Sequence, residues 1–160
     1  VGFNHFADYM LNEPVLIGGE ESGGISFLGH IPEGDGVLMG LLITEMVAES
    51  GGSLSELVDD LLKDVGPADY ARTDLRLKRP VAKQKMVESL KSDAPASIGG
   101  ESVVEIVALD GVKYVLADDS WLLIRPSGTE PVLRVYAEGR SPEMVKALLH
   151  YGEEIAEKFQ

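Results

Sequence analysis

The sequence predicts an α+β fold in which residues 71–160 form an antiparallel sheet with two helices packed on one face, preceded by an incomplete α/β segment. Residues 71–78 alternate strictly between apolar and polar side chains, the period of a half-buried strand. Residues 103–140 hold four further apolar or alternating runs joined by short connections, so consecutive strands can pair antiparallel. Two segments with helical spacing, residues 80–91 and 142–159, supply helices for one face of such a sheet.

The first 66 residues have too few strands to close a sheet alone. Asp35 is positioned to cap one helix, and Ser53 with Glu56 forms a capping box at the start of the next. The expected elements are a helix over residues 2–11, a short buried strand over 15–17, a second strand over 25–28 and helices over 37–48 and 54–65. Residues 66–70 are the predicted boundary and a linker at which the second part can pivot.

Turn and cap residues set the remaining boundaries of the second part. Pro80 is expected to open its first helix, and residues 92–100 to form a loop. Asp110-Gly111 suits the type I′ turn of a tight hairpin, because both central positions of that turn need a positive φ. Ser141, followed by Pro142, marks the start of the last helix.

Composition excludes several classes of function. The chain of 160 residues carries a formal net charge of −13, which argues against nucleic acid or an anionic membrane as the main partner. It has no cysteine, so disulfides and thiolate metal sites are impossible. The longest apolar stretch, residues 37–48, is far shorter than the roughly 20 residues of a membrane span. A cytoplasmic location fits best, and a start without Met inside an apolar pattern suggests a piece of a longer polypeptide.

The strongest candidate site lies between the last two predicted strands. A guanidinium, two hydroxyls and a glycine that lets backbone N–H groups approach a ligand are the parts of a phosphate cradle. The residues are Arg125, Ser127, Gly128, Thr129 and Arg134. Taken alone, the same residues also fit an ordinary polar turn in which Arg125 is a sheet-edge arginine in a salt bridge. A purely structural acidic domain would instead pair Arg125 and Arg134 with Glu130 and Glu138.

A second candidate is the glycine-flanked acidic loop of residues 19–24. Carboxylates such as Glu20 and a hydroxyl such as Ser22 can hydrogen-bond to vicinal sugar hydroxyls. The loop could equally face water or hold a cation. A divalent metal site is disfavoured, because hard cations need several converging oxygens and only two adjacent acids are present.

Together the two loops resemble the C-terminal part of the α-D-phosphohexomutase family, the phosphoglucomutases and phosphomannomutases. The resemblance covers essentially the whole chain. It is carried by Gly19-Glu20-Glu21-Ser22-Gly23, by Asp35-Gly36 ahead of a helix, and by Arg125-Pro126-Ser127-Gly128-Thr129-Glu130-Pro131 with Arg134-Val135-Tyr136.

The resemblance implies a division of labour. Members of the family have four domains, each contributing one loop to a central cleft. Residues 1–66 would be the C-terminal part of domain 3, with Glu20 and Ser22 binding the sugar, and residues 71–160 the whole of domain 4, which is TBP-like in fold. Arg125, Ser127, Gly128, Thr129 and Arg134 would hold the phosphate that is not being transferred.

The implied reaction interconverts hexose 1-phosphate and 6-phosphate through a phosphoserine enzyme and a bisphosphorylated sugar. The serine and the Mg²⁺ loop belong to the missing N-terminal domains, so this chain would have no catalytic residue and no metal ligand, and by itself would be inactive. The substrate would be glucose or mannose 1- or 6-phosphate. The form of the sugar loop slightly favours these over phosphoglucosamine, whose mutase is an alternative.

Two departures from the family pattern concern the sugar side. Many relatives have histidine where this chain has Gly24, and some have lysine where it has Gly34. Two further hypotheses stay open: a free-standing sugar-phosphate binding module without catalysis, and a purely structural acidic domain.

Overall fold

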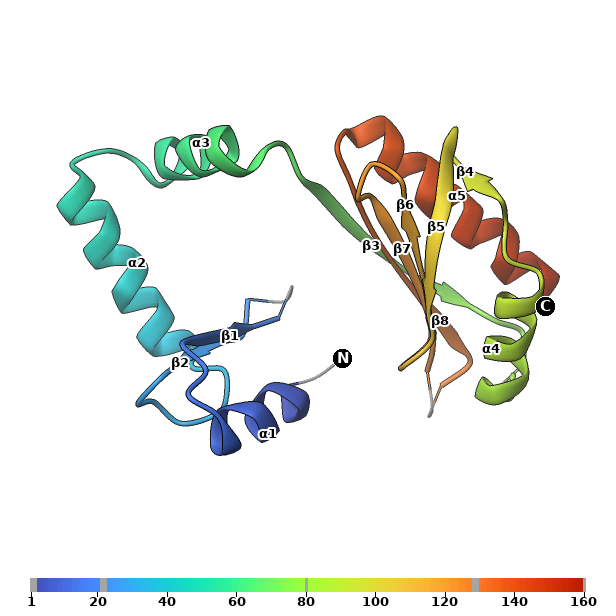
Figure 1. The fold of residues 1–160 in the computed structure, drawn as a ribbon, viewed down its shortest axis with the longest axis horizontal. Coiled ribbons are helices and arrows are strands. Elements are labelled where there is room, and N and C mark those ends of the chain that lie inside the picture. Colours follow the sequence, from blue (N-terminus) through green and yellow to red (C-terminus); the bar gives the residue numbers. More distant parts are fainter. Residues whose placement is uncertain (1–2, 21–22, 80, 128–129, 160) are drawn as a thin grey trace. The chain divides into compact units, whose positions relative to one another are not determined.

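The computed structural model describes residues 3–20, 23–79, 81–127 and 130–159. Its contacts divide the chain into two compact units, residues 1–61 and 62–160. Figure 1 shows the elements of each unit, and each is described by itself below.

The first unit contains helix α1 (Asn4–Asn12), the strands β1 (Ile17–Gly19) and β2 (Ile25–Phe27), and helix α2 (Gly36–Ser50). The two strands pair antiparallel as a separate sheet, with Gly18 opposite Ser26. Phe6 lies against Gly18, where an added Cβ would be 3.1 Å from the Phe6 ring. Helix α3 (Leu54–Val65) follows and crosses the division between the units.

The predicted short buried strand over residues 15–17 is wrong in two respects. The strand starts at Ile17, and the side chains of Leu16 and Ile17 are 75% and 62% exposed. The exposure of Ile17 follows from the side of the strand on which it lies. Phe6 of α1 lies against Gly18, which is buried, whereas the neighbouring Ile17 points to the opposite face and is exposed.

The predicted helix caps in this part are confirmed. The Asp35 carboxylate accepts hydrogen bonds from the N–H groups of Val37 and Leu38, each at 3.0 Å. The Ser53 hydroxyl accepts from the Glu56 N–H, and the Glu56 carboxylate accepts from the Ser53 N–H. No residue of α2 or α3 is buried. No single helix in the described ranges has the length and composition of a membrane span; α2 and α3 reach them only as a pair, bent by 86°.

The second unit is built on a six-stranded antiparallel sheet in the order β3-β8-β7-β6-β5-β4. Its strands are β3 (Asp69–Arg76), β4 (Ser97–Ile98), β5 (Glu101–Val107), β6 (Val112–Leu116), β7 (Trp121–Pro126) and β8 (Val132–Gly139). The first strand thus pairs with the last, beside the β7–β8 hairpin that carries the candidate phosphate loop.

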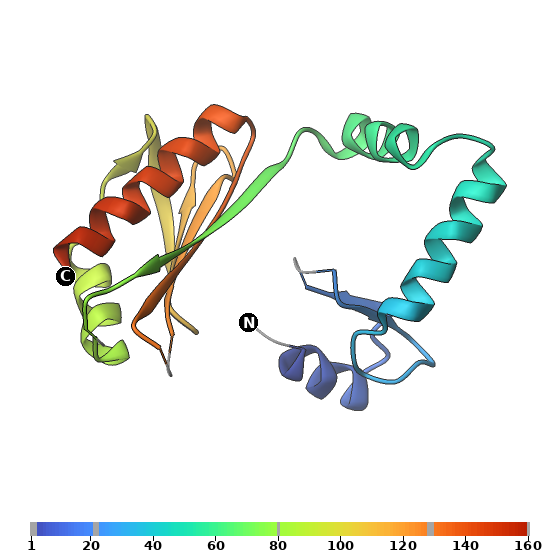
Figure 2. The same ribbon diagram turned by 180° about the vertical axis from the view of Figure 1, so that it is seen from behind.

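Helices α4 (Lys83–Ser92) and α5 (Pro142–Lys158) pack on one face of this sheet, as predicted (Figures 1 and 2). The covered face buries alternate residues of the central strands, among them Leu122, Leu133 and Val135. Gly152 allows α5 to approach β8 closely, because an added Cβ would overlap Val135. The buried Tyr114 hydroxyl donates to the Leu90 carbonyl at 2.7 Å and so joins β6 to the last turn of α4.

Four details of the second unit differ from the prediction. Strand β3 covers Asp69–Arg76 rather than residues 71–78, so Asp69 and Tyr70 of the predicted linker belong to the sheet. Helix α4 begins at Lys83, later than the predicted start at residue 80, and Pro80 itself lies outside the described residues. The predicted loop 92–100 contains β4, which pairs with β5. The type I′ turn is wrong: Gly111 has φ +106°, but Asp110 is not among the described residues with positive φ. The connection from Val107 to Val112 is longer than the two-residue loop of a type I′ turn. The Asp110 carboxylate in this connection contacts Arg125 of β7.

Candidate phosphate-binding site

The uncovered face of the sheet holds the two predicted arginines side by side. Arg125 on β7 and Arg134 on β8 are direct partners in the antiparallel register, at the end of both strands from which the loop of residues 127–131 leaves. Directly opposite residues place their Cβ atoms about 5 Å apart on the same face. Like charges on directly opposite residues of one face destabilise a strand pair. This arrangement therefore needs negative charge nearby.

Asp110 supplies one negative charge. Its Oδ2 accepts a hydrogen bond from the Arg125 Nε at 2.6 Å, and its Oδ1 contacts the Lys83 Nζ at 2.5 Å. Burial acts to raise the pKa of Asp110, but the hydrogen bonds from Lys83 and Arg125 outweigh it and lower the pKa from 3.8 to about 2. Asp110 is thus ionised at neutral pH and joins the first turn of α4 to strand β7.

Gly111 makes this contact possible. Its φ of +106° is a conformation that residues with a side chain rarely adopt. An added Cβ would overlap the Ile124 carbonyl and lie 3.0 Å from the Arg125 Cα. The glycine therefore lets the connection between β5 and β6 pass against β7, which brings the neighbouring carboxylate to Arg125.

The Arg134 side chain differs from that of Arg125 in its hydrogen bonds. Its direct partner on β3 is Asp74, but both Asp74 oxygens accept from Arg72, at 2.9 and 2.8 Å. In the part of the chain that the structure describes, the Arg134 Nε is the one buried side-chain polar atom without a hydrogen-bond partner. An unpartnered buried guanidinium donor costs on the order of 1–3 kcal/mol, which points to a missing acceptor.

The loop between β7 and β8 is closed at its base. The Ser127 N–H donates to the Val132 carbonyl at 2.9 Å, and the Ser127 hydroxyl accepts from the Glu130 N–H at 3.3 Å. A cavity of about 370 Å³ lies beside it, lined by Asp74, Arg76, Leu77, Glu130, Pro131 and Val132. Gly128 and Thr129, the other two predicted phosphate ligands, lie outside the described residues.

Arg125 is in a salt bridge, as the polar-turn alternative expected, but the pairing expected of a structural acidic domain is not the one observed. Arg125 bonds to Asp110 rather than to Glu130, and Glu138 accepts from the Trp121 indole at 3.2 Å. The sequence reading missed Asp110 and Lys83 as neighbours of Arg125. Asp110-Gly111 was visible as a turn, but its register against β7 follows only from the folded sheet.

In the first unit, Glu20 follows β1 directly and opens a tight turn. The Glu20 N–H donates to the Gly24 carbonyl at 2.8 Å, and the Gly23 N–H donates to the Glu20 carbonyl at 3.0 Å. Ser22, the second predicted sugar ligand, lies outside the described residues. The backbone of this loop is thus held by mutual hydrogen bonds at its base.

Gly24 and Gly34, the two expected departures on the sugar side, are neighbours in space. An added Cβ on Gly34 would lie only 3.0 Å from the Gly24 Cα. Next to them, the His30 Nε2 lies 3.1 Å from the Asp35 carboxylate, and the His30 ring stacks on Phe27. The pKa of Asp35 is lowered, first by the hydrogen bond from the Leu38 N–H. Gly24 and Gly34 therefore make a close backbone contact near the His30 imidazole.

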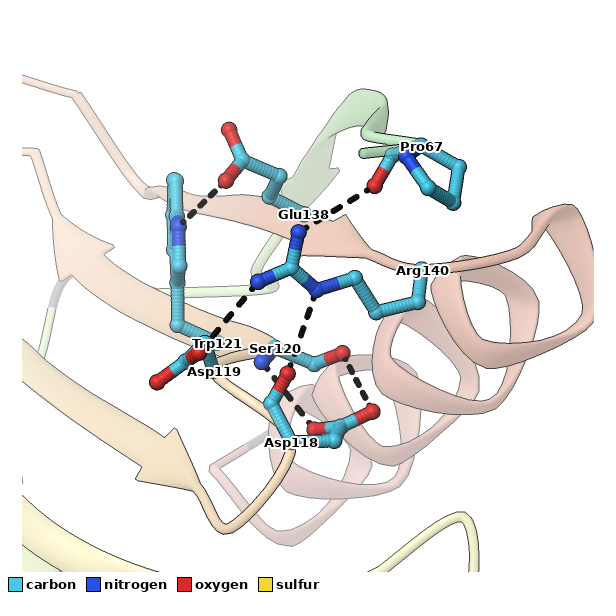
Figure 3. Close-up of polar contacts among 7 residues, drawn as sticks. All are labelled: Pro67, Asp118, Asp119, Ser120, Trp121, Glu138 and Arg140. Atoms are coloured by element: carbon cyan, nitrogen blue, oxygen red, sulfur yellow. Dashed lines mark hydrogen bonds and ion pairs between the residues drawn. The ribbon is translucent and has the colours of Figure 1, made fainter. Parts of the chain in front are cut away.

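Arg140 organises the opposite end of the sheet, after β8 (Figure 3). Its Nε donates to the Asp118 carbonyl and its Nη2 to the Asp119 carboxylate, both at 3.2 Å. Its Nη1 donates to the Pro67 carbonyl at 3.4 Å. Figure 3 shows the guanidinium between these three groups, so the segment at Pro67 is attached to the second unit. This arginine has a structural role.

The described residues do not fit a metal site. Within those ranges, no three side chains of the His, Asp and Glu type gather where they could hold one ion. The two opposed arginines of the second unit suit an anion instead.

Comparisons with known proteins identify the family. Residues 75–155 match the family description "Phosphoglucomutase/phosphomannomutase, C-terminal domain", and residues 1–65 match "Phosphoglucomutase/phosphomannomutase, alpha/beta/alpha domain III". A phosphoglucosamine mutase from Limosilactobacillus reuteri is 34% identical over 145 residues, which are 91% of this chain and 28% of the relative. A phosphoglucomutase/phosphomannomutase from Thermococcus kodakarensis is 34% identical over 149 residues, which are 93% of this chain and 30% of the relative.

Among solved structures, a candidate phosphomannomutase from Thermus thermophilus matches with a TM-score of 0.74 and 33% identity, over 98% of this chain and 30% of that one. The chain therefore spans about 30% of the length of the proteins it matches. A profile for the C-terminal domain covers half of the chain, and a second profile covers most of the remainder. The chain belongs to the phosphoglucomutase/phosphomannomutase family.

Proposed function

We propose that the second unit binds the phosphate group of a hexose phosphate through Arg125, Arg134 and the loop of residues 127–131. The observation that carries this proposal is the unpartnered Arg134 Nε, buried directly opposite Arg125 at the base of that loop. Ser127, Gly128 and Thr129 complete the proposed cradle with hydroxyls and backbone N–H groups.

The charges at the site support a dianion as ligand. Lys83, Asp110, Arg125 and Arg134 together carry two net positive charges. A phosphate monoester dianion matches this sum and would relieve the repulsion between the two guanidiniums. Such a site fixes a phosphate by position and charge without reacting with it, which is what a phosphate that stays in place during transfer requires.

We also propose that residues 1–66 are the C-terminal part of domain 3, with Glu20 and Ser22 binding sugar hydroxyls, and that residues 71–160 are the whole of domain 4. The ranges of the two family matches support this division. Closure over bound phosphate would then use the segment before Pro67, because Arg140 attaches Pro67 to the second unit.

For the whole parent protein, we propose an intramolecular phosphotransferase that interconverts hexose 1-phosphate and 6-phosphate through a phosphoserine. Its serine and Mg²⁺ loop would lie in domains outside this chain, which alone would be inactive. Relatives of equal identity carry the names phosphoglucosamine mutase and phosphoglucomutase/phosphomannomutase, so both substrate classes stay open. A cytoplasmic location also stays a prediction.

An NMR titration of the 160-residue chain with glucose 6-phosphate tests the phosphate site. We expect saturable shifts in residues 125–134 with a millimolar dissociation constant, because only part of the cleft is present. Arg134→Met should weaken binding about tenfold or more, since a charge-assisted hydrogen bond contributes roughly 1.5–3 kcal/mol. Arg140→Met, which removes an equal charge at the far end of the sheet, is the matched control.

Glucose without phosphate should leave residues 125–134 unshifted. Equal affinities of the Arg134 and Arg140 variants for glucose 6-phosphate would reject the site. To separate an enzyme from a free-standing binding module, the parent protein is assayed for conversion of glucose 1-phosphate to glucose 6-phosphate. The enzyme hypothesis expects turnover that Arg134→Met reduces, whereas a binding module would show none.

A further inference from the structure

The carboxylate that contacts Arg125 is a negative charge placed within a site proposed to bind an anion. Asp110 lowers the positive charge that the phosphate would meet, so by charge alone it opposes binding. Its Oδ2 nevertheless holds the Arg125 Nε at 2.6 Å, and the Arg125 and Asp110 side chains are only 21% and 26% exposed. Because the charge of Asp110 opposes phosphate binding, its short and half-buried contact with Arg125 should favour binding in some other way.

Asp110 can favour binding by orienting the Arg125 guanidinium. Arginine has several N–H donors in a planar fork, and a bond at Nε fixes the plane while leaving the Nη donors for a ligand. Without such a bond, the long side chain would be ordered only when phosphate binds, and the conformational entropy lost at that moment would weaken binding. Gly111, whose φ of +106° lets the connection pass against β7, keeps the carboxylate in place.

Lys83 contributes the compensating charge. Its Nζ contacts the other Asp110 oxygen at 2.5 Å, from the first residue of α4. The triad of Lys83, Asp110 and Arg125 therefore has the same net charge as Arg125 alone. The site keeps its attraction for an anion and gains a fixed guanidinium.

We propose that Asp110 and Lys83 belong to the phosphate site, Asp110 as the positioning residue that orients Arg125 and Lys83 as the counter-charge that keeps the site cationic. This inference rests on the proposed phosphate-binding function and extends it to two residues on a different hairpin and helix. The inference has a testable consequence. Removing the charges of Lys83 and Asp110 together leaves the net charge of the site unchanged but no longer fixes the orientation of the Arg125 guanidinium.

The double variant Lys83→Met/Asp110→Ala, which leaves the Arg125 Nε–H no acceptor at position 110, is the test. Its dissociation constant for glucose 6-phosphate is compared with that of the unmodified chain in the NMR titration, at matched pH and salt. We expect at least about fivefold weaker binding, corresponding to roughly 1 kcal/mol. The Arg125 Nε–H signal should also exchange faster with water in the variant, even without ligand. Affinity within twofold of the unmodified chain would overturn the proposal, because charge alone would then account for binding.

A second variant keeps the proposal testable if the double variant unfolds, which its amide spectrum would reveal. Asp110→Ala alone raises the local charge by one unit and removes the acceptor of the Arg125 Nε–H, so electrostatics alone predicts tighter binding, whereas the positioning role predicts weaker binding. Tighter or equal binding would overturn the proposal and mark Asp110 as a competitor of the phosphate. If the unmodified chain does not bind glucose 6-phosphate, the proposed function fails and this inference falls with it. If it binds and the variants bind equally, only the inference fails.

Discussion

The two faces of the C-terminal sheet satisfy opposite requirements. The covered face buries Leu122, Leu133 and Val135 under two helices, and its buried polar group, the Tyr114 hydroxyl, has a partner. The uncovered face places Arg125 opposite Arg134 and leaves the Arg134 Nε without an acceptor in the described residues. The covered face thus has its buried residues packed and its Tyr114 hydroxyl paired, whereas the uncovered face holds Arg125 in an ion pair with Asp110 and an Arg134 Nε without an acceptor. Substitutions on the two faces should therefore have different consequences.

The largest expected effect on stability lies on the covered face. Leu133 is fully buried between the sheet and the helices. Leu133→Ala should lower the free energy of unfolding by about 3 kcal/mol, because it removes buried methyl groups and leaves a cavity. Urea unfolding followed by the fluorescence of Trp121, the only tryptophan, measures the change. A loss below about 1 kcal/mol would contradict the expectation that the covered face contributes most of the stability of this unit.

The next effect tests the polar contact on the same face. Tyr114→Phe removes the hydroxyl that donates to the Leu90 carbonyl, at an expected cost of about 1–2 kcal/mol. Burial also raises the pKa of Tyr114, so the hydroxyl should stay protonated well above the usual pH range. Unfolding of the variant in the same urea assay gives the free energy. An unchanged stability would show that the helix α4 contact contributes nothing.

A pH dependence sharpens the comparison on the uncovered face. The pKa of Asp110 is about 2 in the folded state, below the value of about 3.9 for a free carboxyl. Its ionised form therefore stabilises the fold above about pH 4, and this stabilisation is lost as the pH falls toward about 2. We expect about 1 kcal/mol, after allowing for partial exposure. The stability difference between the unmodified chain and Asp110→Asn should shrink from about pH 5 to about pH 2.5; a constant difference would contradict the ion-pair account.

The smallest effect on stability is expected where the effect on binding is largest. Arg134→Met relieves like-charge repulsion and removes an unpartnered donor, so the free energy of unfolding should change by no more than about 0.5 kcal/mol or increase. The urea assay at neutral pH measures it. A loss of about 2 kcal/mol or more would indicate that Arg134 supports the fold itself.

Local rules were sufficient for most of the fold of the C-terminal unit. Strict alternation located β3, and Ser141 with Pro142 located the start of α5. The same rules gave the positions of β7, β8 and the loop between them, and hence the opposed arginines. Period and capping are properties of neighbouring residues, so they can be recognised without knowledge of the tertiary fold.

The wrong or missing predictions concern residues whose burial and partners depend on tertiary contacts. Leu16 and Ile17 have the composition of a buried strand, but helix α1 lies against Gly18, and Ile17 faces the other side of the strand. Asp110 looked like a turn residue, and its contact with Arg125 depends on the register between β6 and β7. Lys83 reaches the same carboxylate across 27 positions of sequence. Such long-range pairs cannot be inferred from local patterns.

The most direct test of the central claim is the dissociation constant for glucose 6-phosphate of Arg134→Met and of Arg140→Met, each relative to the unmodified chain. The two variants remove the same charge from the same chain, but only Arg134 has an unpartnered Nε beside the β7–β8 loop. We predict a loss of about tenfold or more for Arg134→Met and less than about twofold for Arg140→Met. Equal losses in both variants would contradict a phosphate site at Arg125 and Arg134.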